Sequence, residues 1–282
     1  MSINATEEMI RLHRKMTVEG CVEIGEASSE SIFLDKRRSS FILRNKFRRL
    51  AGDKRLGVLW VVLEPLVMSL VYLFVLTVLR SSIRSESIFI GISLWGLATV
   101  SLMSGIQCLD DFTGGLKCER VRTWVLVKPM VQFRAIDSAC RTSGVAFILF
   151  FAFNVEAFAV LSFMLIGILL GLTFEGLGLN LSRLGHAIPD VKVLVRYFMR
   201  LMFFAGPALY PLTFAEGFHY QANLINPFTY FVELSRHLAD LESAFSDLDP
   251  WFGAIIMVLL IILSLRGYLE IDKLRWELSS WS

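Results

Sequence analysis

Long apolar runs, separated by short polar segments, dominate the chain after residue 56. Six of them are long enough to cross a bilayer as helices, which takes roughly 20 mainly apolar residues. These runs cover about 57–80, 88–109, 133–154, 158–181, 193–212 and 251–269. The pattern therefore predicts an all-α integral membrane protein with six transmembrane helices.

The first run contains two residues that membrane helices rarely carry. Glu64 places a carboxylate in the apolar stretch, and Pro65 removes a backbone hydrogen-bond donor. Glu64 lies only about two turns into the predicted span. At that depth its carboxylate can face a polar cavity or a cationic partner such as Arg196 or Arg200. We expect Glu64 to brace a cytoplasmic gate.

Residues 213–249 fit neither a span nor an ordinary loop. They hold two apolar, aromatic-rich pieces, 214–225 and 228–241, divided by Asn226-Pro227. Each piece is too short to cross a hydrocarbon core about 30 Å thick. Proline disfavours helical geometry in the residue before it, so the division ends a helix. We predict a re-entrant helical hairpin before the last span, and a helix pair lying on the outer surface is the alternative.

The segment before the first run is basic and amphipathic. Leu43, Phe47 and Leu50 recur at helical spacing among arginines and lysines, which predicts an amphipathic helix within 31–55 that lies in the membrane interface. Residues 1–30 form a polar extension, with a short helix expected over 5–16 and a linker over 25–31. Residues 273–282 form a polar tail.

Composition and charge distribution support the membrane interpretation. The chain is 55% hydrophobic, and its mean hydropathy is +0.58. Basic residues concentrate before the first run, after the second and fourth runs, and in the tail, whereas 213–249 is acidic. Because cytoplasmic segments of membrane proteins carry an excess of Lys and Arg, both termini are predicted in the cytoplasm.

The sequence contains no motif for a hydrolytic or ATPase site of its own. HExxH, GxSxG and GxxxxGK[ST] are all absent, and the four cysteines show neither CxxC nor metal-ligand spacing. The candidates for function are therefore the ionisable residues within the apolar runs. They are Glu64, Asp137, Arg141, Glu175, Arg196 and Arg200. Asp137 and Arg141 are four residues apart and can pair on one helix face. Glu233 can pair in the same way with Arg236 or His237.

Several short motifs resemble one membrane-protein family. Leu56-Gly57, Trp60 and Glu64-Pro65 resemble the opening of the first span in ABC-2 type exporter permeases, most closely those that export capsular or O-antigen polysaccharide. Further similarities in the same order are Val127-Lys128-Pro129, Pro189-Asp190, and Asn226-Pro227 followed by VELSR at 232–236. The resemblance covers about residues 38–272, so 56–272 would form the permease domain.

The resemblance implies a transport subunit rather than an enzyme. It implies a homodimer in the bacterial inner membrane that joins two copies of a separate ABC ATPase and exports a lipid-linked polysaccharide. ATP and magnesium would bind to that ATPase, so no cofactor is expected in this chain, and no nucleic-acid partner is implied. Contacts with membrane lipids are implied, and contacts with periplasmic export proteins are left open.

The resemblance also suggests roles for individual residues. Those expected to contact the ATPase are Glu119, Arg120, Arg122, Trp124, Pro189 and Asp190. Those of the first-span motif at the gate are Leu56, Gly57, Trp60, Glu64 and Pro65. Those expected in the translocation channel are Tyr72, Arg196, Tyr197, Arg200 and Tyr210. Those of the re-entrant region are Asn226, Pro227, Phe228, Tyr230, Glu233 and Arg236.

Other functions stay open at this stage. Within the same family, the cargo could instead be a teichoic acid or a drug. From other classes, the chain could be an intramembrane lipid-modifying enzyme or a membrane scaffold. An enzyme would need a convergent acid–base pair, for which Glu64 with Glu175 is the tempting choice.

Overall fold

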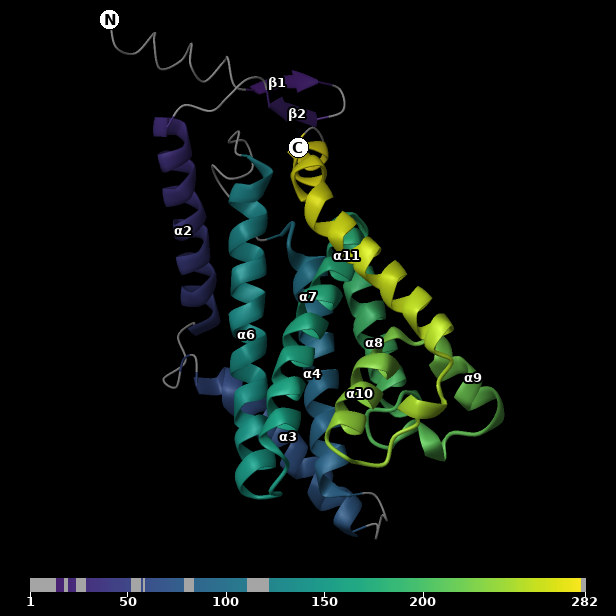
Figure 1. The fold of residues 1–282 in the computed structure, drawn as a ribbon. Helices are drawn as coiled ribbons and strands as arrows, with labels where there is room; N and C mark the ends of the chain where they lie inside the picture. The colour runs from purple at the N-terminus through teal and green to yellow at the C-terminus, as the bar shows by residue number, and fades with distance from the viewer. Residues whose placement is uncertain are drawn as a thin grey trace, which may run out of the picture.

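A computed structural model describes residues 14–17, 20–23, 29–51, 57, 59–78, 84–110 and 122–279. Within these ranges the chain is a helical bundle preceded by a small β-hairpin (Figure 1). The elements are β1 (Arg14–Thr17), β2 (Gly20–Glu23), α2 (Ser29–Ala51), α3 (Leu59–Val78), α4 (Ser85–Gln107), α6 (Thr123–Phe151), α7 (Ala157–Ala187), α8 (Asp190–Ala205), η1 (Leu212–Phe214), α9 (Gly217–Ile225), α10 (Pro227–Leu238), η2 (Phe245–Asp247) and α11 (Pro250–Ser279).

The N-terminal segment departs from the all-α prediction. Strands β1 and β2 pair antiparallel, with Arg14 opposite Glu23 and Thr17 opposite Gly20. The expected helix over 5–16 is therefore wrong at 14–16, because these residues form backbone bonds with the next strand; 5–13 lie outside the described residues. The linker predicted at 25–31 is wrong at 29–31, where α2 has already begun, and 25–28 lie outside the described residues.

Helices α4 and α7 form the centre of the bundle, and glycines let them approach closely. A Cβ atom added at Gly105 would lie 2.3 Å from the Glu175 carbonyl oxygen, and one at Gly178 would lie 2.2 Å from that of Leu102. A similar contact joins α7 to α11, where a Cβ at Gly267 would lie 2.1 Å from the Gly176 carbonyl oxygen. Small residues at helix crossings are typical of packing within membranes, where the backbones can touch.

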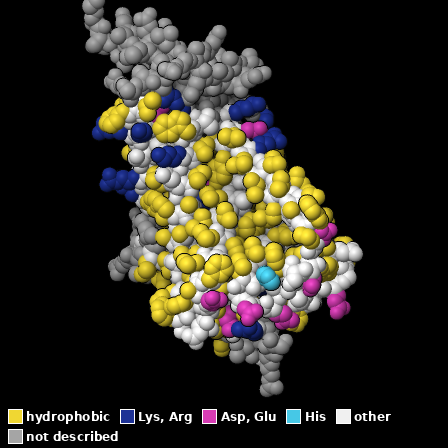
Figure 2. Space-filling model, in the orientation of Figure 1, with side chains coloured by type: hydrophobic (Ala, Val, Ile, Leu, Met, Phe, Trp, Pro, Cys, Tyr) yellow, Lys and Arg dark blue, Asp and Glu magenta, His cyan; other side chains and the backbone are white. Residues whose placement is uncertain are grey.

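Three helices in the described part of the chain are long and apolar enough to cross a membrane. They are Ser85–Gln107, Ala157–Ala187 and Pro250–Ile271, and the stretch Leu59–Val75 is a shorter apolar helix. Figure 2 shows a broad belt of hydrophobic side chains across the surface. Helices α7 and α11 expose large apolar side chains, such as Leu161, Leu165 and Ile255. The chain is thus a multi-pass membrane protein.

Charges of opposite sign mark the two ends of this belt (Figure 2). One end carries exposed arginines of α2, such as Arg37 and Arg44, and we call it the basic end. The opposite end carries exposed acidic residues around α9 and η2 and is called the acidic end: Glu216, Asp240, Glu242, Asp247 and Asp249. This separation follows the asymmetry along the sequence.

Several helix boundaries differ from the hydropathy pattern. Helix α6 begins at Thr123 rather than at about 133, and α7 continues to Ala187 rather than to 181. Hydropathy missed these turns because they carry charged residues that the fold pairs or exposes. The predicted loop 182–192 shrinks to the break at Ile188-Pro189. Helix α8 ends at Ala205 instead of 212, where Gly206-Pro207 follows.

Two short helices separated at Asn226-Pro227 are confirmed as α9 and α10. The Asn226 side chain accepts a hydrogen bond from the Phe228 amide at 3.1 Å and caps α10. The predicted pairing of Glu233 with Arg236 is also confirmed, at 2.9 Å with both side chains fully buried. His237 is exposed on the helix surface instead. Arg236 donates further bonds to the carbonyls of Pro207 and Tyr210, which fixes α10 against the segment after α8.

Candidate functional site

An open cavity of about 560 Å³ lies between α3, α4 and α8. Most of its wall is apolar, and ionisable groups line the remainder. The lining residues are Glu64, Pro65, Met68 and Tyr72 of α3, Ile92, Trp95, Gly96, Leu97, Thr99 and Val100 of α4, Arg141 of α6, and Arg196, Met199, Arg200, Phe203 and Phe204 of α8. Concave, mainly apolar sites with a few polar groups are the usual form of ligand-binding cavities.

Aromatic rings make up a continuous part of the cavity wall. The Phe203 ring centroid lies 5.0 Å from that of Tyr72 and 6.2 Å from that of Trp95. Trp95 in turn meets the buried Phe228 edge-on at 4.7 Å. These contacts connect α3, α4, α8 and α10, so the wall is held by four helices.

The cavity contains more positive than negative groups. Arg196 and Arg200 lie on the same face of α8 as Met199 and Phe203, at helical spacing. Within the described ranges, neither arginine has a carboxylate within ion-pair distance, and Arg200 lies over the ring of Tyr197 at 5.5 Å. Glu64 is the single carboxylate among the lining residues. The described cavity is therefore cationic.

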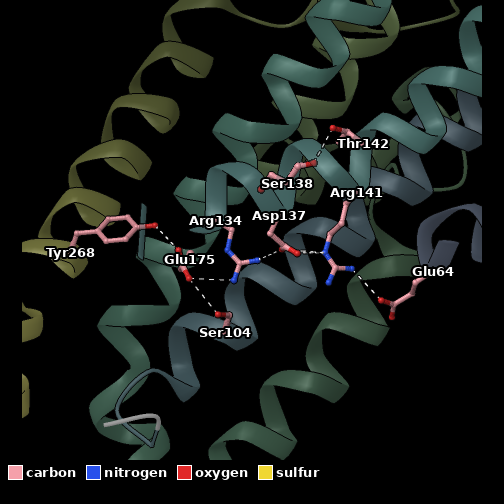
Figure 3. Close-up of polar contacts among 9 residues, drawn as sticks. All are labelled: Glu64, Ser104, Arg134, Asp137, Ser138, Arg141, Thr142, Glu175 and Tyr268. Carbon is pink, nitrogen blue, oxygen red and sulfur yellow. Dashed lines mark hydrogen bonds and ion pairs between the residues drawn. The ribbon is translucent and has the colours of Figure 1, made fainter. Parts of the chain in front are cut away.

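Behind the cavity, buried charged side chains form a connected network (Figure 3). Its centre is on α6, where Arg134, Asp137 and Arg141 share one face at helical spacing. The guanidinium of Arg134 donates to Asp137 at 2.7 Å, and that of Arg141 donates to the same carboxylate at 3.2 Å, which confirms the predicted Asp137–Arg141 pair. We call this group, with Glu64 and Glu175, the charge network.

Glutamates occupy the two ends of the charge network. Arg141 donates to Glu64 on α3 at 3.1 Å, and Arg134 donates to Glu175 on α7 at 3.2 Å. Glu175 also accepts bonds from Ser104 of α4 at 3.3 Å and Tyr268 of α11 at 2.9 Å. Five helices are thereby tied together. Buried charges are stable only when such partners replace the water they lose.

The partner expected for Glu64 was wrong. Its carboxylate pairs with Arg141 rather than with Arg196 or Arg200. The reason is that α3 packs directly on α6, whereas Arg196 and Arg200 project from α8 into the cavity. Glu64 and Glu175 are also separated by the intervening network, since each is bound to a different arginine (Figure 3). An acid–base pair of these two carboxylates therefore has no support from the geometry.

At the basic end, polar contacts join segments that precede and follow the cavity helices. Asp110, after α4, accepts bonds from His186 at 2.9 Å and from Lys192 of α8. Burial by itself raises the pKa of the Asp110 carboxyl, but these two partners outweigh it and the pKa is lowered. Asp35 of α2 pairs with Arg122 at the start of α6 at 3.2 Å, and both side chains are largely buried.

The residues expected at the ATPase side fall into three groups. Glu119 and Arg120 lie outside the described residues, as does Leu56 of the first-span motif at the gate. Pro189 and Asp190 are exposed at the break between α7 and α8. Arg122 is directed to Asp35, and Trp124 packs beside the buried Val125–Leu126 segment.

The residues expected in the channel are only partly brought together. Tyr72, Arg196 and Arg200 line the cavity with Glu64 and Pro65, and Tyr197 is exposed beside it. Tyr210 instead donates to the Ala205 carbonyl, where α8 ends. Phe228 and Tyr230 are buried, and the Tyr230 hydroxyl donates to the Leu224 carbonyl at 2.7 Å.

Several residues of the site are not among those predicted from the sequence. Arg134 could have been found, because it lies three residues before Asp137 on the same helix face. Ser104 and Tyr268 approach Glu175 from helices distant in the sequence, so no local pattern marks them. No sequence pattern marks Gly96 as part of the cavity either. A Cβ added at Gly96 would meet no atom within 4 Å, so this part of the cavity wall faces open space.

Most of the chain matches a known protein family. The sequence model of the ABC-2 type transporter family matches residues 39–239, which is more than half of the chain and contains the cavity and the charge network. No curated protein sequence matches the chain.

Proposed function

Because the chain belongs to the ABC-2 type transporter family and is therefore a permease of an ABC transporter, we propose that it exports a lipid-linked polysaccharide. The cargo is of capsule or O-antigen type, and the membrane is the bacterial inner membrane. A separate ATPase subunit supplies the energy by binding ATP with magnesium. Permeases of this family normally work with such a subunit.

In the proposed arrangement, six helices cross the membrane: α3, α4, α6, α7, α8 and α11. The α9–α10 pair is the re-entrant hairpin and stays at the acidic end. The basic end faces the cytoplasm, in line with the positive-inside rule. The breadth of the hydrophobic belt and the charge separation at its ends support this orientation (Figure 2).

The cavity between α3, α4 and α8 carries the proposal. It is partly open, has an aromatic wall at Tyr72, Trp95 and Phe203, and lies beside the charge network. Aromatic faces stack on the apolar faces of sugars without binding them strongly, which suits a polymer that must slide past. Two copies of the chain, meeting along α3 and α8, would place their cavities on a common path.

Glu64 is the proposed link between the path and the rest of the bundle. Its ion pair with Arg141 holds the first two turns of α3 against α6, and Pro65 is the next residue of α3. Because Glu64 lines the cavity, a movement of α3 against α6 would change the opening there. We assign Glu64 to bracing this opening rather than to contact with sugar.

The ATPase subunit is proposed to bind at the basic end. The segment that contains Glu119 and Arg120 precedes Arg122, which is fixed to α2 by Asp35. Pro189-Asp190 is exposed at the same end. Force applied there would reach α6 and α8, the helices that contribute Arg141 and Arg196 to the cavity.

Reconstitution with a candidate ATPase tests the function. The permease and ATPase should co-purify, and lipid-linked glycan should stimulate ATP hydrolysis in nanodiscs. Stimulation by a drug or by a teichoic acid, with none by lipid-linked polysaccharide, would reassign the cargo. Failure to recruit any nucleotide-binding subunit under conditions where the permease is folded would overturn the proposal.

A further inference from the structure

Two of the arginines that line the cavity, Arg196 and Arg200, have no carboxylate within ion-pair distance in the described part of the chain. Three arginines and one glutamate line the cavity. Glu64 is taken by Arg141, so it does not neutralise Arg196 or Arg200. Unpaired charges beside an apolar wall are costly, and within membrane segments they mark binding or transport sites.

We propose that Arg196 and Arg200 bind the phosphate or diphosphate headgroup of an amphiphile whose chain lies along the apolar wall of the cavity. This assignment rests on the proposed function, since it identifies the ligand with the lipid end of the cargo. The two guanidiniums are one helical turn apart on α8, which lets both donate to the same headgroup. Arginine forks match phosphate oxygens in charge and geometry.

The rest of the lining fits an apolar chain rather than a second polar group. On the same face of α8, Met199 lies between the two arginines and Phe203 follows them, and Phe204 continues the apolar surface. Tyr72 and Trp95 contact Phe203 from α3 and α4. The Thr99 hydroxyl already donates to the Trp95 carbonyl at 3.0 Å, so it offers no free donor to the cavity. A ligand with one anionic end and one apolar end would pair with the two arginines and also cover the apolar wall.

Glu64 gives the site a further property. Its side chain is 56% exposed at the cavity although it is paired with Arg141. A phosphate bound near Arg196 and Arg200 would add negative charge to the same cavity and repel this carboxylate. Headgroup binding would thus favour release of Glu64 from its bracing position.

Direct binding to the full permease–ATPase complex tests the site. The complex is placed in phosphatidylcholine nanodiscs without ATP and titrated with a short-chain polyprenyl diphosphate. We expect saturable binding, and at least tenfold weaker binding of the uncharged polyprenol. Arg196→Gln with Arg200→Gln should weaken diphosphate binding about tenfold or more but leave polyprenol binding unchanged. Arg266→Gln is the matched control, because Arg266 is an exposed arginine outside the cavity.

Filling the cavity provides a second, charge-independent variant. Gly96→Phe adds a ring where the present backbone faces open space. It should block binding of the polyprenyl diphosphate while both arginines remain. Unchanged binding in Gly96→Phe, or in the double arginine variant, would overturn the site.

Two competing ligands separate the possible sources of phosphate. Phosphatidylglycerol that displaces the probe at equal concentration would overturn the assignment to a cargo lipid. Inorganic pyrophosphate that binds as tightly as the probe would overturn the role of the apolar wall. The result is also separable from the proposed function: a complex that binds the probe but shows no glycan-stimulated ATPase activity would refute polysaccharide export while retaining the site.

Discussion

Arg141 of α6 donates a hydrogen bond to Glu64 of α3 at 3.1 Å, and this ion pair joins the cavity to the charge network. Glu64→Gln keeps a polar group but removes its charge. Arg141 still has Asp137, so the free energy of unfolding should change by less than about 1 kcal/mol. Export should fall, because α3 is no longer held against α6 by an ion pair. The readouts are glycan export and recovery of the ATPase complex. Glu216→Gln, at the acidic end, is the control, and full export by Glu64→Gln would reject the bracing role.

Removing Arg134 should be far more damaging to the fold. It lies between the carboxylates of Asp137 and Glu175, and all three are almost completely buried. Arg134→Met leaves two buried carboxylates without their shared partner, which should cost about 3–5 kcal/mol of unfolding free energy. Thermal unfolding in detergent measures this loss. Arg266→Met breaks an exposed pair with Glu270 and should stay within about 1 kcal/mol. Equal effects of both variants would contradict a structural role for the network.

The extent to which the sequence predicted this site depends on the range of the contacts involved. The Asp137–Arg141 and Glu233–Arg236 pairs were predictable, because residues three or four apart on a helix must lie on one face. The helix break at Asn226-Pro227 was predictable from proline geometry. By contrast, the partner of Glu64 depends on which helix α3 packs against, which hydropathy does not specify. The approach of Gly105 to Gly178 is likewise a property of the tertiary fold, and glycine in a helix has no single meaning in a sequence.

Acidic pH should weaken the contacts at the basic end through Asp110. Burial raises the pKa of the Asp110 carboxyl, but the bonds from Lys192 and His186 lower it by a larger amount. The pKa in the folded protein therefore lies below the ordinary value of 3.8. The ionised carboxylate therefore stabilises the fold fully above that value, and this contribution is lost as the pH falls through the lowered pKa. Asp110→Asn should be less stable at neutral pH and should lose less stability on acidification. Unfolding temperature against pH measures both effects, with Asp240→Asn as an exposed control. Parallel pH profiles for Asp110→Asn and the unsubstituted chain would contradict the assignment.

Charge reversal at the ATPase side should separate docking from folding. Arg120→Glu is expected to lower transport-linked ATPase activity while leaving membrane insertion intact. Arg122→Glu should lower that activity too, but it should also destabilise the protein, because it places a carboxylate against the buried Asp35. Asp35→Asn isolates the second effect. ATPase assays of the complex, together with unfolding of the permease alone, distinguish the two. If both arginine variants kept full transport-linked ATPase activity, this surface would not be where the ATPase docks.

Glycine-to-alanine substitutions should have opposite effects at two positions in the same bundle. In Gly178→Ala the new Cβ would lie 2.2 Å from the Leu102 carbonyl oxygen, so α7 must move away from α4. The crossing is backbone against backbone and cannot relax by a rotamer change, so we expect a loss of about 1–3 kcal/mol. In Gly96→Ala the Cβ meets open space, and the better helix propensity of alanine should stabilise α4 by up to about 1 kcal/mol. Unfolding of the two variants side by side gives the sign directly. Since α4 also forms the cavity wall, Gly178→Ala should impair export, whereas Gly96→Ala should fold and assemble normally.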